Sequence, residues 1–175
     1  VRKALDASEL GALLVFDTAN IRYLTSTHIG YWAFNKMERW GLITRTGDPW
    51  IWDFGSAALV HKQQAPWLNP DHSIGGNTGL AGSIPPSSGL VTRAVKEIKG
   101  VLEDEGVGDM PLGVDMAETE MFLELTRAGI DVRNGQQPML QAREIKSEDE
   151  LTLLTQASAM VDGVYQDIYE ALKPG

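Results

Sequence analysis

Most side chains that could do chemistry are gathered in one stretch, residues 28–40. It holds a histidine, four aromatic residues, two cations and an acid in close succession: His28, Tyr31, Trp32, Phe34, Lys36, Glu38, Arg39 and Trp40. The aromatic residues follow neither the period of a strand nor that of a helix, although they could simply fill the core. Aromatic residues mixed with arginine are typical of binding and subunit surfaces. The pattern therefore favours a surface that contacts a substrate or a second subunit.

Other chemistries find little support in the chain. The glycines at positions 75, 76, 79 and 82 lack the lysine and the spacing of a phosphate-binding loop, so they indicate a flexible loop. No serine lies in a nucleophile elbow, and the absence of cysteine excludes disulfides and thiolate chemistry. We expect His61 on a helix surface and His72 in a loop, with no metal-binding spacing among the histidines. Asp53 could be an acid or base, but a turn or capping role is the favoured interpretation.

Composition narrows the class of protein and of partner. The chain of 175 residues has 43% hydrophobic residues and a formal net charge of −9. Its Lys and Arg residues are scattered, which argues against nucleic acid as a partner. No apolar run approaches the roughly 20 residues of a membrane span, and the start is not a signal peptide. We expect a cytoplasmic protein whose natural start lies upstream of Val1, or was processed away.

The elements that must position the 28–40 stretch follow from hydrophobic periodicity. The run at 12–16 predicts a buried strand, and Asp17 can cap a short helix that follows it. Residues 40–45 and 49–54 predict a β-hairpin with Trp50 and Trp52 on one face. Further helices are expected at 1–10 (closed by Gly11), 56–64, 90–105 and 119–128, further strands at 112–115 and 130–132, and a loop at 73–89. This order predicts an α/β sandwich.

The last segment carries the clearest helix signal. Ser147 and Glu150 have the spacing of a capping box. An apolar stripe then repeats every three to four residues: Leu154, Ala157, Val161, Val164, Ile168 and Leu172. So strong a stripe at the end of the chain predicts neighbours that the chain lacks.

Three segments carry a family resemblance: GALLVFDTANIRYLTSTH, PWIWDF and AREIKSEDELTLLTQASAMVDGVYQDIYEALKPG. In this order they resemble the N-terminal domain of the creatinase/prolidase/aminopeptidase P (pita-bread) family and the first helix of its catalytic domain. The IKSxxEL junction is the most specific of them, and residues 66–110 match weakly. The resemblance implies a ribonuclease-H-like mixed β-sheet flanked by helices on both faces over 1–143. Residues 144–175 would be the linker and first helix of a truncated catalytic domain.

The resemblance also implies where the chemistry lies. In the family, two divalent metal ions (Mn, Zn, Co or Fe) are held by an Asp, Asp, His, Glu, Glu set in the catalytic domain. All five positions would fall beyond Gly175. This chain is therefore expected to hold no metal and to be inactive, while its full-length parent would be a metal-dependent hydrolase of the Xaa-Pro peptidase type.

Family members are typically homodimers in which the N-terminal domain of one subunit covers the active site of the other. The residues lent across would come from the 28–40 stretch, with Trp32 and Arg39 as the first candidates and His28 and Tyr31 behind them. The arginine would pair a carboxylate of a small peptide or other small substrate, and the tryptophan would wall the pocket. The expected partners are thus a second copy, the catalytic domain and a small substrate.

Two alternatives remain open from the sequence. The same segments are similar to a non-peptidase branch of the family, the metal-dependent dimethylsulfoniopropionate lyases, which show a like-spaced Trp and Arg. There the reaction is proton abstraction and elimination instead of amide hydrolysis. The other alternative is a free-standing interaction module with no catalytic half.

Overall fold

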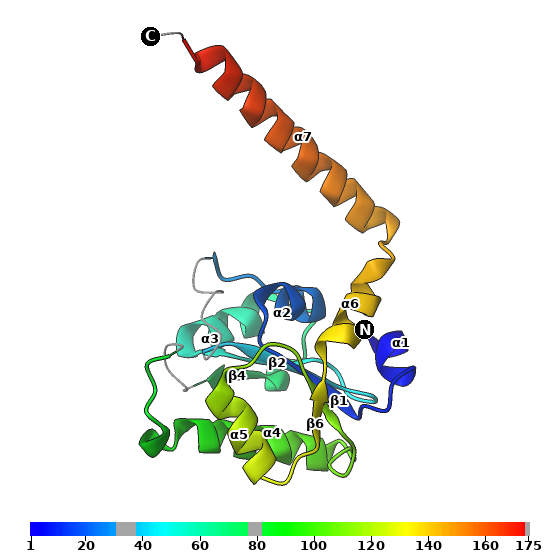
Figure 1. Ribbon diagram of the computed structural model, residues 1–175, viewed down its shortest axis with the longest axis vertical. Coiled ribbons are helices and arrows are strands. Elements are labelled where there is room, and N and C mark those ends of the chain that lie inside the picture. The colour runs from blue at the N-terminus through cyan, green and yellow to red at the C-terminus, as the bar shows by residue number, and fades with distance from the viewer. Residues whose placement is uncertain (31–37, 77–81, 174–175) are drawn as a thin grey trace. The chain divides into compact units, whose positions relative to one another are not determined.

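The computed structural model describes residues 1–30, 38–76 and 82–173, and the chain divides into two compact units (Figure 1). The first unit is Val1–Ala142 and the second is Arg143–Gly175. None of the helices in these described ranges is long and apolar enough to cross a membrane.

A six-stranded mixed sheet forms the centre of the first unit, in the order β4-β3-β2-β1-β5-β6. Its strands are β1 Ala12–Val15, β2 Trp40–Thr44, β3 Trp50–Phe54, β4 Ser73–Gly76, β5 Leu112–Val114 and β6 Val132–Asn134. β2 runs antiparallel to both β1 and β3, whereas the β1–β5, β5–β6 and β3–β4 pairs are parallel. β1 lies in the middle and all its residues are buried, as expected for a continuous apolar run.

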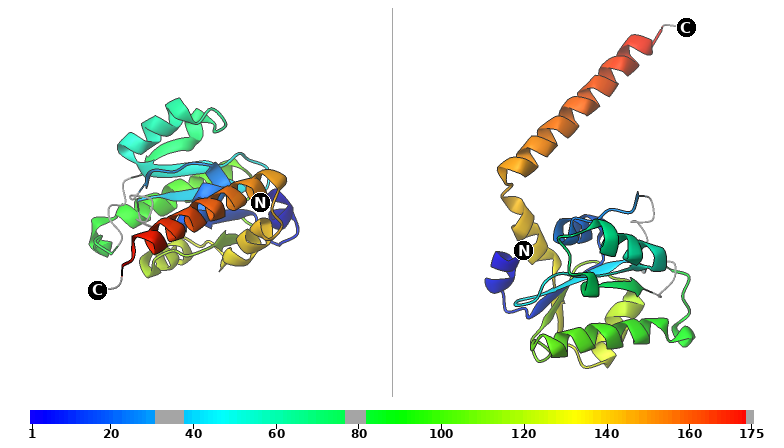
Figure 2. Two further views of the ribbon diagram at one scale, coloured as in Figure 1. Left: turned by 90° about the horizontal axis from the view of Figure 1, so that it is seen from above. Right: turned by 180° about the vertical axis from the view of Figure 1, so that it is seen from behind.

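Helices cover both faces of this sheet. The helices of the first unit are α1 Arg2–Asp6, α2 Thr18–Thr25, α3 Gly55–Gln64, α4 Leu90–Asp104, α5 Thr119–Arg127 and, at its end, α6 Gln136–Glu144. Figure 2 shows α4 and α5 on one side of the sheet, with α2 and α3 on the other. The predicted α/β fold, a mixed sheet flanked by helices on both faces, is confirmed.

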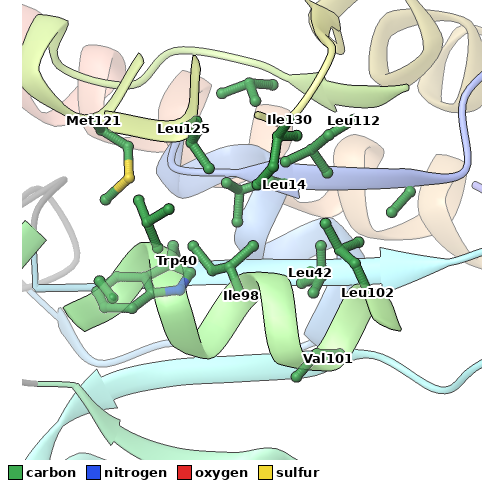
Figure 3. Packing of buried hydrophobic residues seen from close by; sticks show 14 of the residues in the cluster. Leu14, Trp40, Leu42, Ile98, Val101, Leu102, Leu112, Met121, Leu125 and Ile130 are labelled. Carbon is green, nitrogen blue, oxygen red and sulfur yellow. The ribbon is translucent and has the colours of Figure 1, made fainter. Parts of the chain in front are cut away.

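Alternation along β1 divides the apolar side chains into two cores. Leu14 faces α4 and α5 and belongs to the core on that side, called the first core below. Figure 3 shows it packed with Leu42, Ile98 and Leu125. Leu13 belongs to the opposite core with side chains from the other helices and the segment after α3: Leu5, Ile21, Leu68 and Met139. The period of two in a strand sends neighbouring side chains to opposite faces, which is why a four-residue strand serves both cores.

The hairpin carries a stack of tryptophans into the first core. Trp52 lies between Trp40 and Trp50, with ring centroids 5.7 and 6.0 Å away. Ile51 belongs to the opposite core. The prediction that Trp50 and Trp52 share one face, with Ile51 on the other, is confirmed.

Four element predictions need correction. The first helix ends at Asp6, so Gly11 does not close it; a Cβ at Gly11 would lie 2.5 Å from that of Met110. Ser73–Gly76, expected in a loop, is the edge strand β4, and β6 begins two residues later than the strand expected at 130–132. α6 was not expected at all. β4 pairs with β3 through backbone atoms, which a Gly-rich composition does not reveal.

The second unit contains helix α7, Glu148–Ala171. The predicted capping box is present, because the Ser147 side chain accepts from the Glu150 amide and the Glu150 side chain accepts from the Ser147 amide. The apolar stripe is exposed within this unit: Leu154, Val161, Val164 and Ile168 are each at least half exposed.

Replacing Ser147 by alanine should loosen the first turn of α7. Loss of an N-cap serine costs about 1 kcal/mol, so amide exchange in this turn should accelerate roughly fivefold. The hydrogen bonds from Ser147 lower the pKa of Glu150, so the carboxylate stabilises the cap above its unfolded-state pKa. The stabilisation from the Glu150 carboxylate is lost as the pH falls through its lowered folded-state pKa. Exchange measured in acid should therefore differ less between the two proteins, and Thr152→Ala, later in the helix, should change little at either pH.

Candidate functional site

Three ionisable side chains meet inside the first unit, beside the base of the 28–40 stretch. The Nε of Arg39, just before β2, lies 2.9 Å from Oδ2 of Asp53 in β3. Nε2 of His61 in α3 lies 2.9 Å from the same oxygen. The residues are 1%, 0% and 5% exposed, respectively. The cluster is therefore an ion pair with a third polar partner, almost fully removed from water.

Local structure explains why these residues converge. Asp53 stands two residues after Ile51 on β3 and so points to the same face of the sheet. The chain then turns directly into α3, whose inner residues are Ala57, Ala58 and His61. One helical turn separates Ala57 from His61, so the imidazole faces the strand it has just left.

Electrostatics make this cluster costly unless every polar atom is used. Burial lowers the pKa of Arg39, and the neighbouring Asp53 carboxylate opposes that shift. Asp53 is compensated by three groups, since its Oδ1 also accepts from the Phe54 amide at 2.9 Å. A buried pair of this kind holds only when further hydrogen bonds satisfy its remaining atoms. The Arg39 Nη1 atom is the exception, with no hydrogen-bond partner among the described residues.

The other end of Arg39 reaches back along the chain. Its Nη2 donates to the Thr27 hydroxyl, which lies 2.7 Å from the hydroxyl of Thr25 at the end of α2. Thr25 is bonded on both sides, because its hydroxyl donates to the Ile21 carbonyl and its own carbonyl accepts from the Trp67 indole at 2.8 Å. Arg39 thus links the residues that flank 28–38.

The structure places the predicted site residues in different environments. Tyr31 and Trp32 lie outside the described residues. His28 is exposed just after α2, whereas Arg39 is buried. A direct contact from Arg39 to a substrate carboxylate would need an exposed guanidinium, but Arg39 is 1% exposed and its Nε and Nη2 are bonded within the protein.

The predictions for His61, His72 and Asp53 need correction. His61 is not on the helix surface, since it is buried against Asp53. Asp53 does more than cap a turn, because it is the counter-ion of Arg39. His72 lies in the short 3-10 helix Pro70–His72 and stacks on Trp50 at 3.7 Å. Two sequence signals could have placed these residues on buried faces. Asp53 lies two residues after Ile51 on a strand, and His61 lies four residues after Ala57 on a helix.

A second polar cluster gives a structural role to Asn20, the first residue of the Asn-Ile-Arg-Tyr-Leu segment. Asp115, after β5, accepts from the Phe16 and Asp17 amides at 2.7 and 3.0 Å and from the Asn20 side chain at 2.9 Å. Asn20 also donates to Gln136 at 2.9 Å. The fully buried Asn20 therefore ties together the chain segments that follow the parallel strands β1, β5 and β6.

The described residues can be compared with the two-metal ligand set that the resemblance assigns to the catalytic domain. In the part of the chain that the structure describes, no group of three or more histidine, aspartate or glutamate residues could hold a metal ion. The buried cluster offers a single carboxylate already paired with a guanidinium. These residues do not fit a two-metal centre.

Comparisons with known proteins place this geometry in context. No family model matches the chain. It is 24% identical over 147 residues to the dimethylsulfoniopropionate lyase DddP of Roseovarius nubinhibens, a match that covers 82% of this chain. A second such lyase, from Roseobacter denitrificans, is 26% identical over 154 residues and 83% of the chain. The chain spans about a third of the length of these curated relatives, 32% in both cases.

Solved structures show the same fold at lower sequence identity. The Xaa-Pro dipeptidase from Bacillus anthracis matches 99% of this chain with a TM-score of 0.68 at 16% identity, and 42% of the dipeptidase is covered. The N-terminal domain of the cytoplasmic peptidase PepQ from Mycobacterium tuberculosis matches 81% of this chain with a TM-score of 0.51 at 17% identity, and 94% of that domain is covered. The chain therefore has the fold of the N-terminal domain of the pita-bread family of Xaa-Pro dipeptidases and aminopeptidase P, as the resemblance implied.

Proposed function

We propose that the chain is the N-terminal, substrate-facing domain of a larger metal-dependent enzyme of the Xaa-Pro peptidase type. One observation carries the proposal: 99% of the chain matches only 42% of an Xaa-Pro dipeptidase. The described residues supply no metal-binding group. In the proposed enzyme, the metals and the reacting groups belong to a catalytic domain that this chain does not include.

The surface beside the buried cluster is proposed to face the substrate of a second subunit. His28 is exposed there, and Tyr31 and Trp32 follow it in the sequence. Arg39 acts from the interior, because its burial and bonded nitrogens suit a support better than a direct substrate contact. In this arrangement the domain selects the substrate and the catalytic domain transforms it.

A second candidate reaction is favoured by sequence. Both curated relatives cited above are named as dimethylsulfoniopropionate lyases, at 24% and 26% identity, above the 16% of the dipeptidase match. The same domain could therefore serve an elimination on a small sulfonium substrate. Fold does not distinguish the two, since one fold hosts different chemistries.

The test begins with the full-length gene product. An Asp, Asp, His, Glu, Glu set is expected within about 250 residues downstream, a domain-sized stretch; its absence would favour the free-standing interaction module. The protein is then assayed on an Xaa-Pro dipeptide and on dimethylsulfoniopropionate, with Mn²⁺, Zn²⁺, Co²⁺ or Fe²⁺ supplied in turn. Hydrolysis of the first supports the peptidase proposal, while turnover of the second alone assigns the lyase.

The placement of this domain over another subunit requires a dimer. Sedimentation equilibrium of the full-length protein should give twice the chain mass. Trp32→Ala should then lower kcat/KM, because the proposed pocket loses an aromatic wall. A protein that stays monomeric at all concentrations would remove the contribution across subunits and leave the rest of the proposed function standing.

A further inference from the structure

The two residues that flank residues 28–38 are joined inside the protein by one side chain. Thr27, 3% exposed, lies on one side in the sequence and Arg39, 1% exposed, on the other. The Arg39 Nη2 donates to the Thr27 hydroxyl. The residues on either side of 28–38 are therefore held together away from water.

Each end of this link is itself fixed. On one side Asp53 receives Arg39, His61 and the Phe54 amide, each at 2.9 Å. On the other side Thr27 meets Thr25, whose hydroxyl donates to the α2 carbonyl of Ile21 at 2.8 Å. The chain of bonds runs from α3 through β3 to α2 without crossing an exposed residue, so the guanidinium has a single defined position.

A gain in stability does not by itself explain why these charged residues are buried. Removing two charges from water costs several kcal/mol per ion, and well-packed apolar residues often do as well or better. What apolar residues cannot supply is direction: hydrogen bonds define distances and angles. A directional link between Thr27 and Arg39 sets how far apart the ends of residues 28–38 stand, which apolar packing would leave less precise.

We propose that Arg39, Asp53 and His61 form a positioning clamp, which acts through Thr27 to fix the origin of the exposed His28 and of the residues after it. This rests on the proposed function, because it assigns the clamp a part in presenting the substrate-facing surface. Its members are positioning residues that do not touch the substrate.

The test uses Thr27, since valine keeps its shape and removes only the hydroxyl. Thr27→Ser retains the hydroxyl and serves as the rescue. Thr44→Val is the matched control, because Thr44 is fully buried and its hydroxyl accepts from the Gly47 amide at 2.8 Å, away from the clamp.

The first measurement is limited tryptic cleavage of the 175-residue chain after Lys36, compared with cleavage after Lys96 within α4. Loss of a hydrogen bond to a charged group should accelerate cleavage after Lys36 about tenfold in Thr27→Val. Cleavage after Lys96, which reports unfolding of the whole domain, should change far less, and Thr27→Ser should restore the original ratio. If Thr44→Val changes the ratio as much as Thr27→Val does, the clamp is an ordinary stabilising contact and the proposal is overturned.

The second measurement concerns the full-length enzyme with whichever substrate it turns over. Thr27→Val should raise KM several-fold with a smaller change in kcat, Thr27→Ser should recover it, and Thr44→Val should leave it unchanged. Equal kinetics in all three proteins, despite faster cleavage in Thr27→Val, would overturn the link to substrate. Inactivity of the unmodified enzyme on both substrates would instead count against the proposed function, and the cleavage ratio would still decide the clamp.

Discussion

Replacing Arg39 by alanine is expected to lower the free energy of unfolding by about 3–5 kcal/mol, the cost of breaking a buried ion pair from one side. The variant leaves the Asp53 carboxylate, 0% exposed, without its cation. It also removes the donor to Thr27. Since the whole stability of a domain is about 5–15 kcal/mol, the loss is large. Urea denaturation followed by circular dichroism measures it.

Two companion variants separate charge from packing. Arg133→Ala removes an exposed pair, in which Nη2 lies 2.8 Å from Asp131 Oδ2, and should lower the free energy of unfolding far less than Arg39→Ala does. The double variant Arg39→Met with Asp53→Leu should recover part of the loss, because apolar replacement of both ion-pair partners is often close to neutral. Recovery should be incomplete, because His61 and the Phe54 amide lose their acceptor. A cost below about 1 kcal/mol for Arg39→Ala would mean that the pair does not form in solution.

Replacing Trp52 by alanine is expected to cost a similar amount, about 3–5 kcal/mol. The ring is fully buried between Trp40 and Trp50, so its removal opens a cavity in the centre of the first core. The indole N–H also donates to Glu97 on α4 at 3.0 Å. The variant thus weakens both the hairpin and its contact with the helix that covers it.

Trp67 provides a control, because it is a tryptophan that is largely exposed where Trp52 is buried. Trp67 is 60% exposed, and its indole donates to the Thr25 carbonyl at 2.8 Å. Trp67→Ala should therefore cost only about 1 kcal/mol, the net value of one hydrogen bond. Equal losses in the two variants, measured by far-ultraviolet circular dichroism, would contradict the burial that distinguishes the two tryptophans.

The strongest local signals predicted much of the fold. The apolar run of β1, the cap at Asp17, the hairpin and the stripe of α4 all formed as their patterns indicated. Each of these depends on residues close in sequence, where periodicity and capping act directly. The elements that were missed, β4 and α6, are stabilised mainly by distant partners: β4 pairs with β3, and α6 buries Met139 in the core that contains Leu13.

The candidate site divides in the same way. The sequence alone identified the 28–40 stretch as unusual, because aromatic and charged residues concentrate there, and the family resemblance named Arg39 within it. Only the tertiary structure revealed that Arg39 points inward to Asp53, which lies 14 residues later in the chain. Asp53 is in turn bonded to His61, which lies 8 residues further on. The physical reason is that a charged residue gives no local sign of burial. Whether it meets water or a counter-ion is decided by the strand and helix that the fold brings beside it.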